Sequence, residues 1–259
     1  MPIGILDSGV GGLTIWKDIV TRLPQESTLY LGDSKNCPYG TKTEEEIWKL
    51  TQKLVEKLLE QHVSLVVVAC NTISVIALEK LRELHPTIPF IGTVPAIKAA
   101  VVESRTKRIG VLSTPRTAES AYQKKLLEEF AADCEVVNLG TNKLVPLVEA
   151  GELKGPHVTE ILREVLQPFI DARIDTLVLG CTHFPFLKTE MQKILGEEVV
   201  ILDSGAAIAR QVERILAEKT CSDPSGQHQI LTSGDPEQMN RILETMRDII
   251  PLTNATLLV

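Results

Sequence analysis

The apolar and polar residues at the start of the chain follow two regular patterns in turn. Residues 3–7 (IGILD) form a short apolar run, and residues 8–12 (SGVGG) form a glycine-rich turn. Apolar residues then recur at helical spacing between Leu13 and Val20. A second apolar run at residues 28–33 (TLYLGD) precedes the turn residues of 37–40 (CPYG). We therefore predict a strand, a turn and a helix, followed by a second strand and a loop.

Two helices and two further strands are predicted over residues 43–94. Thr43 followed by three glutamates is typical of a helix start, because acidic side chains favour the N-terminal end of a helix. A buried strand follows at residues 65–70, and Pro86 and Pro89 end the helix after it, before a fourth strand at residues 90–94. The apolar faces of the two helices are expected to consist of Ile47, Leu50, Leu54 and Leu58 in the first, and Ile73, Ile76, Leu81 and Leu84 in the second.

The same succession of elements then starts again. Residues 108–113 (RIGVLS) are similar to the opening strand, and residues 135–140, 176–181 and 199–203 follow it as the second, third and fourth strands did. Strands that alternate with helical patterns indicate parallel sheets with right-handed crossovers. We predict an α/β fold of two homologous parallel-sheet domains with the active site in the cleft between them. The first domain is expected to comprise residues 1–95 plus 207–259, and the second residues 96–206.

The end of the chain is expected to pack on the first half, because the second half already has its four strands. A polar loop at residues 221–226 precedes a strand at residues 229–232 and a last helix that reaches about Ile249. The helix before this loop is predicted from the spacing of Ile208, Val212, Ile215 and Leu216.

Composition and charge narrow the function classes. The chain has 259 residues, of which 44% are apolar and 24% charged, as in ordinary globular proteins. Its net charge of −7 argues against a nucleic-acid partner, which would require clustered Lys and Arg. We expect a soluble cytoplasmic protein without a membrane partner, because no signal peptide and no run of ~20 apolar residues is present. The cysteines are odd in number and form no CxxC pair, which favours free thiols in a reduced compartment: Cys37, Cys70, Cys134, Cys181 and Cys221.

Two of these cysteines occupy matched positions in the two halves. Cys70 ends the run LVVVAC and Cys181 ends the run TLVLGC, and a helix-like pattern follows each. Ligands of open α/β sheets collect at the carboxyl ends of the strands, so both thiols are expected at one cleft. A single cysteine at such a position is more often a small core residue, but a matched pair favours function. We also expect helix N-termini to lower the pKa of these thiols from ~8.5.

Such a pair of thiols has several chemical uses. The two could act as acid/base groups, as a nucleophile and its helper, as a redox pair or as metal ligands. Redox work usually uses CxxC, and metal binding would need more His and Cys than these segments supply, so we predict no metal. The glycine-rich turn at residues 9–12 is neither GxGxxG nor GxxxxGK[ST], so we expect no nucleotide cofactor, and no motif indicates a pyridoxal-phosphate lysine.

Small polar residues follow the same strands, and Lys and Arg are nearly absent from these turns. Hydroxyl, amide and backbone N–H donors at helix N-termini suit the carboxylates of a small acid, although each residue alone could be an ordinary helix cap. The residues concerned are Asp7, Ser8, Asn71, Thr72, Thr114, Thr117, Thr182 and His183.

With these motifs in this order, the chain resembles the cofactor-independent aspartate/glutamate racemase family over nearly its whole length. The motifs that carry the resemblance are DSGVGG at residues 7–12, PYG at 38–40, ACNT at 69–72, GCTHFP at 180–185, DSG at 203–205 and TSGD at 232–235. The resemblance implies two α/β domains related by a pseudo-dyad. It also implies that glutamate is racemised without a cofactor, to supply D-glutamate for peptidoglycan synthesis in a bacterial cell wall, and it suggests a homodimer.

The resemblance assigns roles to individual residues. Cys70 would deprotonate D-glutamate with help from Asp7, and Cys181 would deprotonate L-glutamate with help from His183. Glu149 matches a third auxiliary acid/base, although a solvated helix carboxylate is an equally good interpretation from its sequence context. Substrate would be bound by Asp7, Ser8, Tyr39, Gly40, Asn71, Thr72, Thr114, Thr117, Thr182 and His183.

Three alternatives remain open from the sequence. An aspartate racemase, or a racemase of another small acid, would have the same fold and differ in cleft depth. A two-lobed carboxylate-binding protein would close on its ligand without chemistry, but it would have no use for a thiol in each lobe. A thiol redox protein would form a disulfide between Cys70 and Cys181 under mild oxidation.

Overall fold

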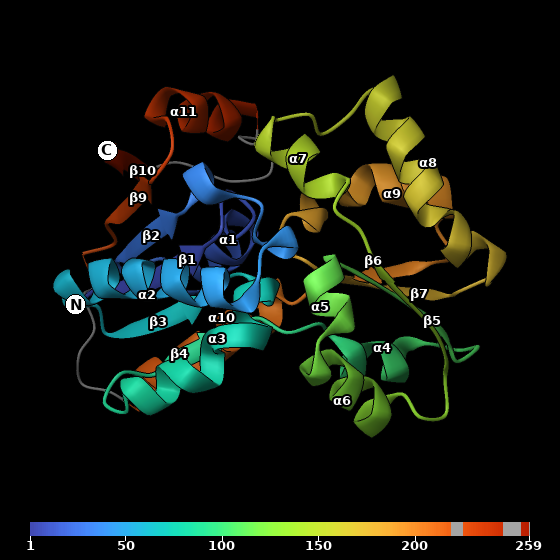
Figure 1. Ribbon diagram of the computed structural model, residues 1–259, viewed down its shortest axis with the longest axis horizontal. Helices are drawn as coiled ribbons and strands as arrows, with labels where there is room; N and C mark the ends of the chain where they lie inside the picture. The colour runs from blue at the N-terminus through green and yellow to red at the C-terminus, as the bar shows by residue number, and fades with distance from the viewer. Residues whose placement is uncertain (219–224, 246–254, 259) are drawn as a thin grey trace.

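The computed structural model describes residues 1–218, 225–245 and 255–258. Cys221, most of the predicted loop around it and the predicted end of the last helix near Ile249 lie outside these ranges. Within the described residues the chain forms two α/β lobes that lie side by side (Figure 1). None of the described helices is long and apolar enough to cross a membrane.

The first lobe is built on a parallel sheet to which both ends of the chain contribute. Its strand order is β10-β9-β2-β1-β3-β4. The strands are β1 (Ile3–Asp7), β2 (Thr28–Gly32), β3 (Leu65–Val68), β4 (Phe90–Gly92), β9 (His228–Thr232) and β10 (Ala255–Leu258). The pairing of β9 with β2 confirms that the end of the chain packs on the first half. The last strand, β10, was not predicted.

The second lobe contains a smaller parallel sheet with the order β6-β5-β7-β8. Its strands are β5 (Arg108–Ser113), β6 (Glu135–Gly140), β7 (Thr176–Gly180) and β8 (Val200–Leu202). This order matches β2-β1-β3-β4 of the first lobe strand for strand, which confirms the predicted repeat and the α/β fold class. The domain boundaries at residues 95/96 and 206/207 stay a prediction.

Helices cover both faces of the sheets (Figure 1). In the first lobe they are α1 (Leu13–Arg22), α2 (Glu44–Glu60), α3 (Asn71–Leu84), α10 (Gly205–Ala217) and α11 (Pro236–Thr245). In the second they are α4 (Ile97–Glu103), α5 (Pro115–Glu119), α6 (Ala121–Phe130), α7 (Leu144–Glu149), α8 (Pro156–Asp171) and α9 (Lys188–Leu195). Short 3₁₀ turns are η1 (Ser34–Asn36), η2 (Tyr39–Thr41) and η3 (Phe184–Leu187).

The central strands are apolar throughout because both of their faces are buried. In β3, Val67 belongs to the core under α1 and α10, whereas Val66 and Val68 belong to the core under α2 and α3. A run of consecutive apolar residues is the expected signature of such a parallel strand. The core under α1 continues into the second lobe, where Leu144 and Phe184 belong to the same cluster. The core under α1 and α10 therefore extends through both lobes.

The start of α2 confirms the predicted helix cap. The Thr43 hydroxyl accepts a hydrogen bond from the Glu46 backbone N–H, and the Glu46 carboxylate accepts one from the Thr43 N–H. This reciprocal pair is a capping box, which satisfies backbone donors that the first helical turn leaves free.

The predicted apolar face of α3 was wrong at one end. Leu81 is fully buried, but Leu84 is 56% exposed. Leu84 is the last residue of α3, and the chain then turns away through Pro86 toward β4, so no neighbouring element covers this side chain. On the predicted faces, Leu50 and Ile76 are only partly buried and pack at the margin of the core.

These two leucines provide a matched pair for testing the fold. Leu81→Ala should lower the free energy of unfolding by about 2–5 kcal/mol, because it removes buried methyl groups and leaves a cavity. Leu84→Ala should change it by no more than about 0.5 kcal/mol, because its side chain is largely in water. Denaturant unfolding followed by circular dichroism measures both. Equal losses in the two variants would contradict this account of the core.

Candidate active site

The loop after β1 lies where the two lobes meet. The Gly9 backbone N–H donates to the Asp7 carboxylate over 2.8 Å, and the Tyr30 hydroxyl donates to the Gly9 carbonyl over 2.7 Å. From the same loop, the Val10 N–H donates to the Glu149 carboxylate of the second lobe over 2.8 Å. The loop is thus fixed to its own sheet on one side and to α7 on the other.

The glycines of this loop allow side chains of the second lobe to approach the backbone. A Cβ atom added at Gly9 would lie 1.9 Å from Glu149 Oε1, and one at Gly11 would lie 2.2 Å from His183 Nδ1. Any larger residue would push these groups away. The glycine-rich turn therefore receives a carboxylate and an imidazole of the same chain, which accounts for its glycines without a nucleotide.

Cys70 lies at the N-terminus of α3, separated from β3 by Ala69, and is buried. Its thiol donates to the Ser8 hydroxyl with the sulfur 3.6 Å from the oxygen. Burial raises the pKa of Cys70 to about 12, and the nearby Asp7 carboxylate adds to this effect. The prediction of a lowered pKa was therefore wrong: the Ile73 N–H at the helix start does favour the thiolate, but the loss of hydration outweighs it.

Cys181 is the first member of a chain of polar contacts in the second lobe. Its sulfur lies 3.8 Å from His183 Nδ1, and His183 Nε2 lies 2.6 Å from Glu149 Oε1. All three side chains are largely buried, with the Glu149 side chain 18% exposed. Unlike Cys70, Cys181 does not lead directly into an α-helix, because the 3₁₀ turn η3 comes between it and α9.

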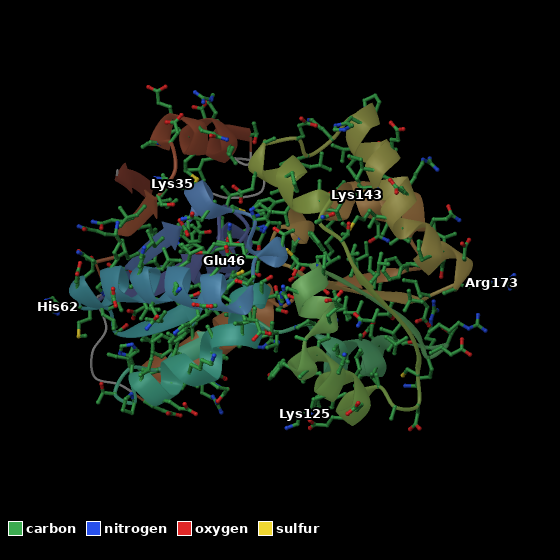
Figure 2. The ribbon with its side chains drawn as sticks, viewed as in Figure 1. Lys35, Glu46, His62, Lys125, Lys143 and Arg173 are labelled. Atoms are coloured by element: carbon green, nitrogen blue, oxygen red, sulfur yellow. The ribbon has the colours of Figure 1, made fainter. Side chains whose placement is uncertain are left out.

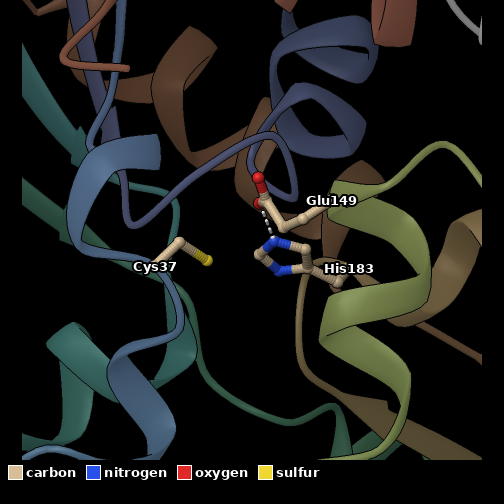
Figure 3. A group of neighbouring side chains, drawn as sticks. All are labelled: Cys37, Glu149 and His183. Carbon is tan, nitrogen blue, oxygen red and sulfur yellow. Dashed lines mark hydrogen bonds and ion pairs between the residues drawn. The ribbon is translucent and has the colours of Figure 1, made fainter. Parts of the chain in front are cut away.

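The surroundings of His183 favour its charged form. Burial alone lowers the pKa of His183, but hydrogen bonds with Cys181, Cys37 and Glu149, together with the charge of Glu149, raise it well above the usual 6.5. Figure 3 shows the imidazole ring between Cys37 of the first lobe and Glu149 of α7. Sequence reasoning missed Cys37 as a neighbour of the site; its only signal was its position directly before the PYG motif.

The structure brings the two predicted groups of residues into one site. The Thr182 hydroxyl, next to Cys181, donates to the Asp7 carboxylate over 3.4 Å. Cys181 also lies close enough to Cys70 to influence the pKa of that thiol electrostatically. Burial raises the pKa of Asp7, although His183 and the Gly9 N–H oppose this. That the two cysteines act on opposite faces of one ligand stays a prediction.

The predicted threonines form a cluster across the cleft. The Thr72 hydroxyl lies 2.9 Å from that of Thr114 and 3.4 Å from that of Thr117, and the last two lie 3.0 Å apart. Gly40 packs against Thr114, since a Cβ atom at Gly40 would lie 2.8 Å from Thr114 Cβ. These contacts join the PYG loop and α3 of the first lobe to the start of α5.

Two predicted binding residues have donors that are engaged within the protein. The Tyr39 hydroxyl donates to the Asp33 carboxylate over 2.5 Å, and the Asn71 amide donates to the Thr93 carbonyl over 3.3 Å. Their hydroxyl and amide oxygens remain available as acceptors.

Two cavities border the site. One, of about 600 Å³, is lined by Cys37, Glu149 and Met239 among others. The second, of about 220 Å³, is lined by residues that include Asn71 and Cys181. One cavity thus opens beside Cys181 and the other beside Cys37 and Glu149.

Two similar parallel α/β lobes thus each carry one buried cysteine at the end of a matched strand. The sequence model of the Asp/Glu/Hydantoin racemase family matches residues 5–212. The chain belongs to this family.

Relatives of the chain resemble it over almost their whole length. A glutamate racemase from Pseudomonas putida is 41% identical over 247 residues, which cover 95% of this chain and 93% of the relative. The crystal structure of a glutamate racemase from Bacillus anthracis has a TM-score of 0.88 at 34% identity and covers 100% of this chain and 97% of its own. The Escherichia coli glutamate racemase, in complex with L-glutamate and the activator UDP-MurNAc-ala, has a TM-score of 0.88 at 32% identity, covering 100% of this chain and 98% of its own.

The pairing of His183 with Glu149 can be tested by titration. Glu149→Gln should lower the pKa of His183, because it removes the negative charge beside the ring. The raised pKa in the folded protein means that the protonated ring stabilises the fold below about pH 6.5 and that this contribution is lost as pH rises through the folded-state pKa. Histidine ring NMR signals followed against pH measure the shift.

Glu152→Gln is the matched control for this titration. It removes the carboxylate of the exposed His157–Glu152 pair, whose atoms are 2.9 Å apart, and should leave the His183 titration unchanged. An unchanged His183 titration in Glu149→Gln would show that the carboxylate does not control the ring.

Proposed function

We propose that this protein is a glutamate racemase, which interconverts L- and D-glutamate by proton transfer at the α-carbon without a cofactor. The observation that carries the proposal is the meeting of Cys70 and Cys181, from matched strands of two lobes, in one buried site. The 41% identity with the Pseudomonas putida enzyme and the L-glutamate bound to the Escherichia coli structure support glutamate as the substrate.

The reaction requires one group on each face of the α-carbon. In the L-to-D direction the Cys181 thiolate takes the α-proton, the carbon keeps the electron pair, and the Cys70 thiol delivers its proton to the opposite face. In the reverse direction Cys70 takes the proton and Cys181 delivers one. Each thiol must therefore serve as both acid and base, which thiols can do because their two protonation states are both accessible to the reaction.

Each thiol has a different neighbouring acid/base group. Asp7 lies beside Cys70, and its raised pKa suits a carboxyl group that exchanges a proton with its surroundings. His183 is linked to Cys181 and Glu149, so it can exchange a proton with Cys181. Without a ligand the pKa of Cys70 is about 12, and the positive ammonium group of an amino-acid substrate near Asp7 would lower it.

Polar donors around the thiols suit the two carboxylates of glutamate. The proposed ligand groups come from Ser8, Tyr39, Gly40, Asn71, Thr72, Thr114, Thr117 and Thr182. The hydroxyl cluster of Thr72, Thr114 and Thr117 is buried and lies across the cleft, so a carboxylate bound there would contact both lobes.

The other candidate functions have less support. Relatives at about 40% identity over nearly the whole chain are glutamate racemases, which favours glutamate over aspartate. A carboxylate-binding protein without chemistry would not account for a buried thiol in each lobe. Supply of D-glutamate for peptidoglycan, a cytoplasmic location and a homodimer remain part of the proposal, as do the two domains of residues 1–95 plus 207–259 and 96–206.

The activity can be tested with L-glutamate in D2O, with reductant and no added cofactor. Circular dichroism should decay to zero while deuterium enters the α-carbon. Cys70→Ala and Cys181→Ala should each abolish turnover in both directions, because each direction needs both thiols, whereas Cys134→Ala should retain it. Turnover in Cys70→Ala or in Cys181→Ala would exclude the two-thiol mechanism. A flat trace for the wild type with both glutamate and aspartate would favour a binding protein.

The roles of Asp7 and His183 can be distinguished by comparing the two directions of the reaction. Asp7→Asn and His183→Asn should slow the reaction unequally from the L and D sides, because each helper serves a different thiol. Initial rates measured from each enantiomer, with deuterium exchange to follow each proton transfer, separate the two effects. Equal slowing in both directions for both variants would remove the case for separate helpers.

A further inference from the structure

Cys37 is a thiol beside the active site that the proposed reaction does not use. It lies after η1, directly before Pro38, and is partly buried. One ligand atom each from Cys37, Glu149 and His183 lie within 4.8 Å of one another. Figure 3 shows the Cys37 sulfur pointing toward the imidazole ring from the first lobe, while Glu149 contacts the ring from α7. The three groups thus surround a common point between the lobes.

These three groups form a ligand set that suits zinc. Thiolate, imidazole and carboxylate are the usual protein ligands of Zn²⁺, with bonds of about 2.0–2.3 Å. Binding displaces a proton from His183 and one from Cys37, whose pKa burial raises to about 12, because a coordinating thiol is deprotonated by the ion. The thiolate and the carboxylate then balance the two positive charges, and the imidazole binds in neutral form. Carboxylate-only sites favour Mg²⁺ or Ca²⁺, whereas sulfur and nitrogen favour Zn²⁺ and its transition-metal neighbours.

Small side-chain movements bring the atoms to tetrahedral geometry. Ligand atoms around a tetrahedral zinc ion are about 3.3–3.8 Å apart, given these bond lengths. The 2.6 Å contact between His183 Nε2 and Glu149 Oε1 must open to admit the ion, whereas the Cys37 sulfur lies within 4.8 Å of both atoms. A small rotation of the Glu149 side chain can supply this change, because the 600 Å³ cavity that Cys37 and Glu149 line leaves space on that side.

The surroundings provide the remaining parts of a metal site. The cavity lined by Cys37 and Glu149 offers a position for water as a fourth ligand. The Val10 N–H, 2.8 Å from Glu149 Oε1, orients the carboxylate, and partners of this kind strengthen metal binding. His183 is held on its other side by Cys181.

We infer that Cys37, Glu149 and His183 form a binding site for Zn²⁺ or a similar divalent transition-metal ion, and that the bound ion inhibits the enzyme. An ion on His183 Nε2 keeps the ring in its neutral form, with its proton on Nδ1, so the charged ring cannot form. Ligands from both lobes also hold the cleft in one arrangement. The binding site itself does not depend on the proposed racemase function, whereas the inhibition rests on it.

Cobalt absorption tests the site without turnover. Co²⁺ added to wild-type protein should give a thiolate-to-metal charge-transfer band, which Cys37→Val should lack. Cys134→Val and Cys181→Ala should keep the band, because their thiols are not ligands of the proposed site. A band that persists in Cys37→Val, a band lost in Cys181→Ala, or no band in the wild type would each overturn the inference. Cys37→Ser repeats the test with a smaller change in shape.

Zinc inhibition of the racemase tests the consequence. Micromolar Zn²⁺ should inhibit the wild type, and Cys37→Val should need at least about tenfold more, because even the loss of an outer-sphere partner costs 10–100-fold in metal affinity. The inhibition of each protein is measured against its own activity in EDTA, because Cys37 also contacts His183. Equal zinc sensitivity of the two proteins would overturn the inhibitory role. If the wild type lacked racemase activity, the proposed function would fail while the cobalt band still decided the metal site.

Discussion

The structure depends on the close contact between the backbone of residues 8–12 in the first lobe and two side chains of the second, Glu149 and His183. This contact is possible only because Gly9 and Gly11 lack a Cβ atom in the positions that the carboxylate and the imidazole occupy. The Val10 N–H completes the contact by donating to Glu149. With the lobes fixed in this way, Thr182 reaches Asp7, and the two thiols come to share one site.

The shared apolar core supports the same contact from behind. Leu147 and Val148 of α7 belong to the same buried cluster as Leu13 and Trp16 of α1. Helix α7 therefore carries apolar residues that anchor it and ends in Glu149, which faces the site. Burial that joins the lobes also removes water from the thiols, and this is the main cause of the high pKa of Cys70. The packing that joins the lobes therefore also raises the pKa of Cys70.

The sequence predicted what depends on local patterns. Apolar runs buried on both faces, the Thr43 cap and the repeated succession of strands and helices all follow from residues close together in the chain. It missed what depends on distant packing. Residues 255–258 form a strand because β9 pairs with them, the exposure of Leu84 depends on what lies beyond the helix end, and the neighbours of His183 include Cys37 from a loop far away in sequence. The pKa of Cys70 was mispredicted for the same reason, since burial is a tertiary property.

The strand order has a consequence for how the protein is made. The second sheet is complete once residue 202 has left the ribosome, because its four strands lie between Arg108 and Leu202. The first sheet must wait, since β2 receives its neighbour β9 only after residues 228–232 are synthesised. Until then one side of β2 presents unpaired backbone groups, which invite pairing with other chains. The lobe that begins the chain is therefore the last to be finished during translation.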